Sequence, residues 1–171
     1  MPSPDETNYK IESLNKSHNR DNFNCGSPVL NRYLQQQATQ DKRKYVAAPF
    51  VAVDLDCKLI IGYYTLSATS INLPDLPAQF IKRLPKYPLV PAILLGRLAV
   101  DIHYQKQGWG DLLLMDALNR SFSNEIAATC IVVEAKDEQA IRFYQSYDFL
   151  QFTDSPHRLF LPMTIISKIF N

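Results

Sequence analysis

The sequence predicts a mixed α/β (α+β) fold, with a central sheet and helices on both of its faces. Apolar and β-branched runs of strand length recur along the chain, at residues 49–56, 58–71, 92–100 and 129–135. Segments with the apolar spacing of an amphipathic helix lie before, between and after these runs. Strands that alternate with helices in this way are typical of a mixed sheet covered by helices.

Length and composition are those of a globular protein with one core. The chain has 171 residues, of which 46% are hydrophobic and 20% charged. A chain of this size suits one domain that buries a core without outside help. We therefore expect a single domain over residues 1–171, with residues 1–20 as a peripheral N-terminal segment.

Targeting signals and metal patterns are missing from the sequence. No apolar run approaches the ~20 residues that a membrane helix requires, and the N-terminus lacks the basic start and apolar stretch of a signal peptide. Cys25, Cys57 and Cys130 are widely spaced, so they form neither a metal-binding pattern nor an obvious disulfide framework. We expect a cytoplasmic protein that holds no metal.

The first half of the chain predicts one helix and a pair of strands. Ser27 is a good N-cap and a proline follows it, so we expect a helix through residues 29–40 that ends before a basic cluster. Residues 49–56 and 58–71 predict two strands joined by a tight turn at Asp56.

A proline-rich segment separates this pair from the next strands. Five prolines between residues 73 and 91 indicate an irregular segment around a short helix at 78–84. The apolar run 92–100 is nearly continuous, which predicts a strand covered on both faces. Residues 129–135 predict a second buried strand.

Two helices and a last strand complete the prediction. Apolar residues at positions 114, 115, 118 and 122 predict a helix over 111–122 with one apolar face. Asp137 can cap a helix that runs through Tyr147. Residues 158–165 predict a final strand that closes the chain.

The junction after residue 100 is the most informative local feature. It reads QKQGWG over residues 105–110 and opens directly onto the predicted helix 111–122. Free N–H groups at the start of a helix, together with the helix dipole, favour a bound anion. Gly108 and Gly110 let the backbone approach that anion without a side chain in the way. We interpret the junction as a cradle for the pyrophosphate of coenzyme A.

The charge of the chain is uneven. The net charge is +1, but residues 1–90 carry 11 lysines and arginines against 8 acidic residues, whereas residues 91–171 carry 7 against 9. Two basic clusters dominate the first half: Lys42, Arg43 and Lys44, and then Lys82, Arg83 and Lys86. They are either solvated faces or a docking surface for a polyanion.

Taken together, these motifs resemble the GCN5-related N-acetyltransferase (GNAT) family. Within it, the chain is similar to the acetyltransferase toxins of bacterial type II toxin–antitoxin modules. The resemblance spans the chain from residue 23 to its end, and the order of its parts is more specific than any one of them. The segments that carry it are FNCG, GYYTLS, the proline-rich segment, LLGRLAVD, QKQGWG, EAKDEQAIRFY and LFLPMTI.

The resemblance implies acetyl-CoA as cosubstrate. It implies a GNAT sheet splayed between its fourth and fifth strands, with the pantetheine arm in the gap against Leu98, Ala99 and Val100. The amides of pantetheine would pair with unpaired backbone groups of the strand, as an added strand does. The pyrophosphate would lie on Gln105, Lys106, Gln107, Gly108, Trp109 and Gly110. Asp111 would start the supporting helix and face outward, because a carboxylate pointing inward repels phosphate.

Tyr144 is the residue that the resemblance implies as the catalytic acid. A tyrosine on the helix after the later strand lies near the thioester sulfur in the family and can protonate the departing thiolate. The alternative is a purely structural role, because Ala140, Phe143, Tyr144 and Tyr147 have the spacing of an aromatic core stripe.

Arg97 and Trp109 each leave two interpretations open. A charge inside an apolar strand must be paired or serve a site, so Arg97 either forms an ion pair with Asp101 or Glu134 or contacts substrate. The indole of Trp109 either packs on the helix or touches the cofactor, and we expect packing.

The chain departs from the family pattern at three points. Related toxins often carry a glycine at the position of Lys106, and their later helix runs into a glycine where this chain has Asp148. We expect a left-handed backbone at Asp148, which aspartate tolerates less readily than glycine. Related toxins also tend to be more basic than this chain.

The resemblance implies a toxin that acetylates the α-amino group of aminoacyl-tRNA and so blocks translation. The tRNA would contact Lys42, Arg43, Lys44, Lys82, Arg83, Lys86 and Arg97. The implied partners are a ribbon-helix-helix antitoxin and a second copy of the chain, as a homodimer. Two alternatives remain: a GNAT enzyme that acetylates a protein or small-molecule amine, and a catalytically silent acyl-CoA-binding module.

Overall fold

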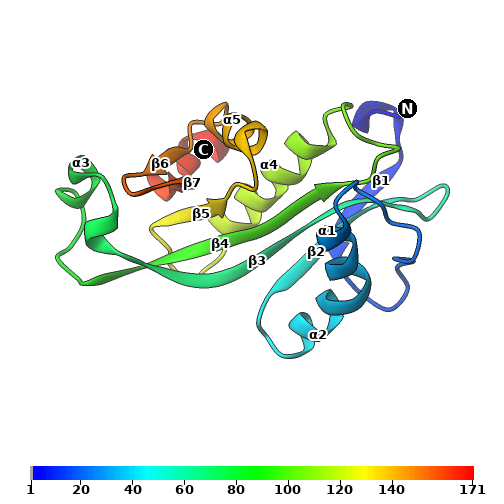
Figure 1. Ribbon diagram of the computed structural model, residues 1–171, viewed down its shortest axis with the longest axis horizontal. Helices are drawn as coiled ribbons and strands as arrows, with labels where there is room; N and C mark the ends of the chain where they lie inside the picture. Colours follow the sequence, from blue (N-terminus) through cyan, green and yellow to red (C-terminus); the bar gives the residue numbers. More distant parts are fainter. Residues whose placement is uncertain (1) are drawn as a thin grey trace. The chain divides into compact units, whose positions relative to one another are not determined.

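A computed structural model describes residues 2–171 (Figure 1). Their contacts form two compact units. We call N-terminal unit the residues up to Ser67 together with Gly96–Ala117, and C-terminal unit the residues Ala68–Leu95 together with Leu118–Asn171. The expected single domain over residues 1–171 stays a prediction, and each unit is described by itself.

The sheet has the mixed α/β character that the sequence predicts. Seven strands are hydrogen-bonded in the order β1-β2-β3-β4-β5-β7-β6. Strands β4 (Leu89–Val100) and β5 (Cys130–Glu134) are parallel, whereas β1–β2, β2–β3, β5–β7 and β6–β7 are antiparallel. Strand β3 (Ile60–Asn72), β4 and helix α4 (Trp109–Phe122) each contribute residues to both units.

The N-terminal unit begins with a strand that the sequence analysis missed. Strand β1 (Tyr9–Ser13) pairs with β2 (Ala48–Asp54), so the N-terminal segment is part of the sheet. A short 3-10 helix, Pro4–Glu6, precedes it. The strand is short: Tyr9, Lys10, Ile11 and Glu12 alternate between apolar and polar, but only over four residues, so its pairing depends on the neighbouring strand more than on local pattern.

The first helix is longer than predicted and changes its geometry midway. Helix α1 (Pro28–Arg32) passes through a π-helical turn, Tyr33–Gln37, into α2 (Ala38–Arg43). Ser27 caps α1 as predicted, because its side chain accepts from the N–H of Leu30 at 3.4 Å. The prediction that the helix ends before the basic cluster is wrong, since no glycine or proline stops it there.

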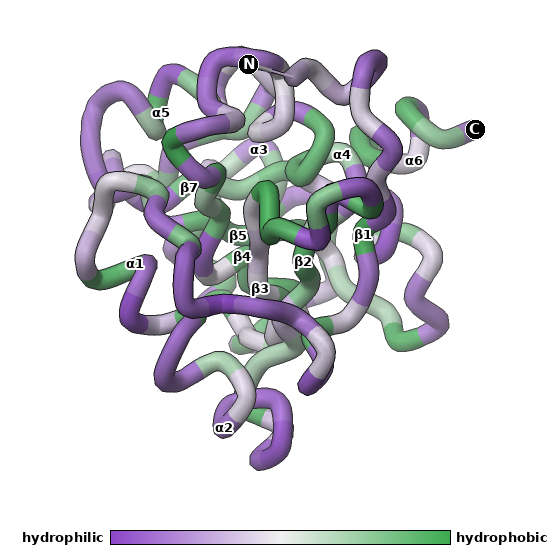
Figure 2. Tube along the Cα trace, turned by 90° about the vertical axis from the view of Figure 1, so that its right-hand side faces the viewer, coloured by the Kyte–Doolittle hydropathy of each residue, from purple (hydrophilic) through white to green (hydrophobic). Residues whose placement is uncertain are grey.

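These helices pack on the β2–β3 part of the N-terminal unit. Its core contains Phe23, Tyr33, Leu34, Tyr63 and Ala99. Figure 2 shows α2 as a mostly hydrophilic segment. Of its residues only Ala38 is buried, so the basic end of α2 faces solvent.

The C-terminal unit carries the paired residues of β4 and β5 and three whole helices, one before and two after β5. The register of β4 and β5 runs from Ala92 opposite Cys130 to Leu95 opposite Val133. Strands β6 (Leu150–Phe152) and β7 (Ser155–Pro162) follow helix α5 (Glu138–Gln145). The proline-rich segment holds a 3-10 turn, Leu73–Asp75, and helix α3 (Ala78–Ile81).

The prediction that the final strand runs to residue 165 is wrong. The final strand ends at Pro162 and α6 (Met163–Phe170) follows, because proline cannot donate to the sheet and suits the residue before a helix. Ile166 is buried in α6, and Phe170 stacks on Phe122 with ring centres 6.0 Å apart.

Strand β4 is also less covered than predicted. Of the run 92–100, only Ala92, Leu95 and Ala99 are buried. An unbroken apolar run is therefore not evidence of burial on both faces, because much of any protein surface is apolar.

Candidate coenzyme and catalytic site

The turn between β4 and α4 has the backbone of an anion cradle. Lys106 and Gly108 both lie in the left-handed region, with φ of 62° and 93°. A Cβ added at Gly108 would meet no atom within 4 Å, so the backbone there borders open space. The position that is often glycine in related toxins thus requires a positive φ here too, and lysine accepts it at a cost.

Helix α4 leaves free donors next to this turn. The N–H of Leu112 donates to the carbonyl of Gly108 at 3.1 Å, which closes the first helical turn. The N–H groups of Trp109 and Gly110, the first two residues of the helix, have no acceptor within it. Asp111 is exposed, as its charge predicts. Free N–H groups, an open backbone and the positive end of a helix fit a pyrophosphate.

Two side chains of the turn hold it in place and are not available to a ligand. The amide of Gln105 donates to the carbonyls of Cys25 and Val100, at 2.9 and 2.8 Å. The indole of Trp109 is 1% exposed and donates to the carbonyl of Pro2 at 2.9 Å. The expectation that Trp109 packs is confirmed, so any contact of these two residues with coenzyme A comes from their backbone.

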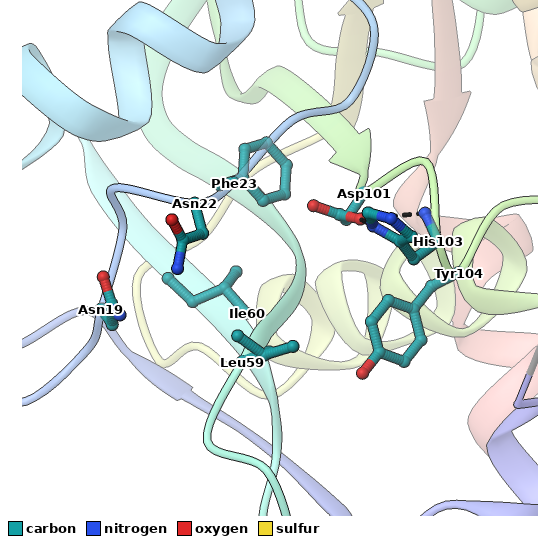
Figure 3. Close-up of a pocket in the computed structure, with 8 residues that line it drawn as sticks. All are labelled: Asn19, Asn22, Phe23, Leu59, Ile60, Asp101, His103 and Tyr104. Carbon is teal, nitrogen blue, oxygen red and sulfur yellow. Dashed lines mark hydrogen bonds and ion pairs between the residues drawn. The ribbon is translucent and has the colours of Figure 1, made fainter.

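An acid–imidazole pair follows β4 directly (Figure 3). Asp101 is 5% exposed; it accepts from the N–H of Asn24 at 3.0 Å and lies 2.9 Å from Nδ1 of His103. These residues line a cavity of about 160 Å³ together with Asn19, Asn22, Phe23, Leu59, Ile60 and Tyr104. Burial, with hydrogen bonds to Cys57 and Asp54, raises the pKa of Tyr104, so its hydroxyl stays protonated.

Gly62 on β3 fits closely against the end of β4. A Cβ at this position would lie 2.6 Å from the carbonyl oxygen of Ala99 and 2.8 Å from Cδ1 of Leu113. No other residue fits there without a shift. The sequence analysis did not single out this glycine, although an isolated glycine within a strand is a signal of close backbone approach.

Tyr144 lies on α5 with its hydroxyl unused. Asp137 caps this helix as predicted, accepting from the N–H of Ala140 at 2.8 Å. Tyr144 is 8% exposed, and its ring lies 5.2 Å from that of Phe143 and 5.3 Å from that of Phe149. Within residues 2–171 its hydroxyl has no hydrogen-bond partner.

Burial raises the pKa of Tyr144, so the hydroxyl carries its proton at neutral pH. It is therefore both protonated and free to donate to a ligand. The left-handed backbone expected after this helix is confirmed, since Asp148 has a φ of 69°. The N–H of Phe149 then donates back to the carbonyl of Tyr144 at 3.2 Å, which helps to hold the aromatic cluster together.

Comparison with known proteins identifies the family. Residues 92–166 match the model of the acetyltransferase (GNAT) domain. A tRNA-acetylating toxin of Mycobacterium tuberculosis is 33% identical over 144 residues, which are 81% of this chain and 83% of the toxin. The chain belongs to the GNAT acetyltransferase family. The probable toxin TacT of Sinorhizobium fredii is 26% identical over 93% of each chain.

Solved structures of GNAT toxins have the same fold. AtaT complexed with acetyl-methionyl-tRNAfMet matches with a TM-score of 0.88 and 29% identity, over 96% of this chain and all of AtaT. AtaTR bound with AcCoA matches with a TM-score of 0.83 and 28% identity, over 95% of this chain and 98% of that one. A point mutant of AtaT bound to the C-terminus of the antitoxin AtaR matches with a TM-score of 0.81 and 27% identity, over 95% of this chain and 98% of that one.

In this GNAT enzyme, one of the three residues predicted to contact pantetheine is buried and two are partly exposed. Ala99 is buried, whereas Leu98 and Val100 are half-buried. The carbonyl of Val100 already accepts from Gln105. The splay of the sheet and the roles of Gln107 and Gly110, which lie in the turn and in the first turn of α4, stay predictions.

Arg97 of this acetyltransferase uses neither predicted ion-pair partner. Its guanidinium carbon lies 3.5 Å from the ring centre of Tyr33, and no ion pair involves it within the described part of the chain. The predicted pair with Asp101 or Glu134 is therefore wrong. Asp101 is already engaged by backbone N–H groups and His103, and the guanidinium gains a π face instead.

The two basic clusters are exposed, one in each unit. Lys42 and Arg43 form the last turn of α2 and Lys44 follows, although the ammonium of Lys42 also donates to the carbonyl of Leu14. The other cluster follows α3 in the C-terminal unit and consists of Lys82, Arg83 and Lys86. Their contact with tRNA stays a prediction.

Residues 2–171 contain neither a metal-binding cluster nor a membrane-spanning helix. No group of three or more His, Cys, Asp or Glu side chains in that range could hold a metal ion. None of the helices there is long and apolar enough to cross a membrane.

Proposed function

We propose that this GNAT protein is an acetyl-CoA-dependent N-acetyltransferase that acetylates the α-amino group of aminoacyl-tRNA and thereby blocks translation. The observation that carries the proposal is similarity over nearly the whole chain to tRNA-acetylating toxins, including AtaT complexed with acetyl-methionyl-tRNAfMet. An acetylated α-amine is no longer nucleophilic, so it cannot accept a growing peptide.

The donor half of the reaction uses the turn after β4. The free N–H groups at the start of α4 and the open backbone at Gly108 hold the pyrophosphate, and Lys106 adds a positive charge nearby. The half-buried Leu98 and Val100 line the pantetheine arm. Acetyl-CoA bound in this way supplies the acetyl group as a thioester.

The chemistry requires few side chains. A neutral amine attacks the thioester carbonyl to form the carbon–nitrogen bond, and its nitrogen then releases a proton to solvent. The carbon–sulfur bond breaks, the departing thiolate takes a proton from the Tyr144 hydroxyl, and a proton from solvent restores the tyrosine. Holding amine and thioester together supplies much of the rate, and a positioned general acid contributes roughly 10²–10⁴-fold. The free, protonated hydroxyl of Tyr144 supports this role.

The proposed RNA contacts and protein partners are those that the same relatives suggest. The exposed clusters Lys42–Lys44 and Lys82–Lys86, with Arg97, would contact RNA phosphates. A toxin of this kind requires an antitoxin, as in the complex of AtaT with AtaR, and we propose a ribbon-helix-helix antitoxin and a homodimer. Free thiols at Cys25, Cys57 and Cys130 suit the reducing cytoplasm, where aminoacyl-tRNA is found.

Transfer of labelled acetyl from acetyl-CoA to a panel of aminoacyl-tRNAs tests the proposal. We expect label in acid-precipitable RNA with at least one charged tRNA. Deacylated tRNA, and the same aminoacyl-tRNA already acetylated, are matched controls that should take up none. Label on spermidine or on added protein, with none on any aminoacyl-tRNA, would overturn the proposal and select another amine as acceptor.

A further inference from the structure

Arg97 is a partly exposed arginine whose hydrogen-bond donors are all free. It lies on β4 in the N-terminal unit, and its guanidinium carbon lies 3.5 Å from the ring centre of Tyr33. No hydrogen-bond acceptor or ion-pair partner is found for it in residues 2–171. The stack occupies one face of the guanidinium, so the N–H groups along its edge are left for a ligand.

The ring below Arg97 is itself held in place. Tyr33 is 7% exposed, and its hydroxyl donates to Oδ2 of Asp41 at 2.8 Å. The other oxygen of Asp41 accepts from the amide of Gln37 at 2.9 Å. The ring of Tyr63 stacks behind Tyr33, with centres 6.2 Å apart and planes 14° apart. Tyr33 therefore gives Arg97 a fixed platform.

A π-helical turn, Tyr33–Gln37, begins at the ring that carries Arg97. Residues eight apart, such as Tyr33 and Asp41, already share the broad face of a regular α-helix. The residue that the turn inserts brings the two side chains closer to alignment. Such insertions are unfavourable by themselves and frequently occur at functional sites.

The protonation states of the cluster keep the Tyr33 ring in place. The hydrogen bond from Gln37 lowers the pKa of Asp41, and the bond from Tyr33 and the charge of Arg97 lower it further. Burial, and then the bond to Asp41, raise the pKa of Tyr33 to about 12. At neutral pH Asp41 is therefore an ionised acceptor and Tyr33 a neutral donor, so the hydrogen bond that fixes the ring below Arg97 persists.

We propose that Arg97 is a phosphate-binding residue and that Tyr33 and Asp41 are its positioning residues. The planar fork of a guanidinium matches a phosphate in two parallel hydrogen bonds, which rewards a fixed orientation. Resting on the proposed function, the phosphate is a backbone phosphate of the acceptor RNA. The phosphates of coenzyme A are the second source of the same chemistry.

Binding of uncharged tRNA tests the phosphate contact without any acetylation. Fluorescence anisotropy gives the Kd at several salt concentrations for the wild type and for Arg97→Gln. We expect about tenfold weaker binding, and a slope of log K against log salt that is smaller by about 0.7–0.9. Arg158→Gln is the matched control, because Arg158 is also a half-buried strand arginine over an aromatic ring, 4.3 Å from that of Phe152.

Calorimetric titration with coenzyme A and with dephospho-coenzyme A separates the second source. Weaker binding of coenzyme A by Arg97→Gln, with tRNA binding unchanged, assigns the phosphate to the coenzyme. Wild-type binding of both ligands by Arg97→Gln overturns the proposal. Failure of the wild type to acetylate any aminoacyl-tRNA sinks the proposed function but leaves both titrations readable.

The positioning residues are tested by Tyr33→Phe, Asp41→Ala and Asp41→Asn. Phenylalanine keeps the ring and loses the bond to Asp41, so we expect a 3–10-fold higher KM for aminoacyl-tRNA with kcat unchanged. Asp41→Ala should raise this KM by a similar factor. Asp41→Asn keeps an acceptor for Tyr33, so its KM should stay close to that of the wild type. A lower thermal midpoint with a wild-type KM in Tyr33→Phe and Asp41→Ala would overturn the positioning role.

Discussion

The side-chain amide of Gln105 donates to the carbonyl of Val100 at 2.8 Å, which ties the phosphate turn to the last residue of β4. The same amide donates to Cys25 at 2.9 Å. The glutamine of the Gln-x-x-Gly-x-Gly pattern is thus a brace for the turn, and we predict that a coenzyme contacts the backbone of the turn.

Gln105→Ala should loosen the turn without changing the chemistry. It leaves two backbone carbonyls without their donor, at about 1–2 kcal/mol of unfolding free energy, and we expect a several-fold higher KM for acetyl-CoA with a smaller change in kcat. Steady-state kinetics and urea unfolding measure both. Gln151→Ala is the matched control, because its amide also donates to a backbone carbonyl, that of Pro156, at 2.9 Å. A wild-type KM in Gln105→Ala would show that the brace is dispensable.

Lys106→Gly should be more stable than Lys106→Ala. The positive φ at this position costs an L-residue about 1–2 kcal/mol, and glycine does not have this cost. Part of that gain is lost to the extra freedom of glycine in the unfolded chain, so we expect a difference of about 1 kcal/mol in urea unfolding. At Lys136, which is exposed and has no positive φ, the order of glycine and alanine should reverse. Equal stability of the two variants at position 106 would contradict the backbone assignment.

Gly62→Ala should destabilise the protein by about 1–3 kcal/mol through overpacking. The added Cβ would lie 2.6 Å from the carbonyl oxygen of Ala99, and a backbone atom cannot move aside as a side-chain end can. Because Ala99 is one of the residues predicted to line the pantetheine, we also expect weaker acetyl-CoA binding. Thermal unfolding and calorimetric titration measure the two effects, and unchanged values in both would mean that β3 and β4 adjust freely.

Tyr144→Phe should lower kcat roughly 10²–10⁴-fold, as expected for loss of a general acid. The hydroxyl has no partner in residues 2–171, so its removal should leave the free energy of unfolding nearly unchanged. Tyr147→Phe is the control and should keep its activity, because Tyr147 lies past the end of α5, which stops at Gln145 and not at Tyr147 as the sequence predicts. Wild-type kcat in Tyr144→Phe would leave Tyr144 only its place in the aromatic cluster.

The pH dependence of the acetyl-transfer step follows from the same tyrosine. A general acid acts only while protonated, and burial raises the pKa of Tyr144 above its ordinary value. Single-turnover rates should therefore show no loss from Tyr144 ionisation up to about pH 10, near the ordinary pKa of tyrosine. An alkaline limb near pH 8 that disappears in Tyr144→Phe would contradict this.

Local signals in the sequence predicted local structure well. Ser27 and Asp137 are helix caps, and Asp148 adopts the left-handed backbone expected at a helix end. The chain end was predicted less well: the predicted strand 158–165 includes the first three residues of α6, because LFLPMTI is mostly apolar and a short apolar run suits either element.

The sequence by itself determined the family-defining turn and the caps, because backbone preferences of glycine, proline and capping residues act within a few residues. Only the tertiary structure decided what Gln105, Trp109 and Arg97 do. Gln105 donates to Val100 and Cys25, Trp109 donates to Pro2, and Arg97 stacks on Tyr33. Most of these partners lie far away along the chain, and packing brings them together, which no local pattern encodes.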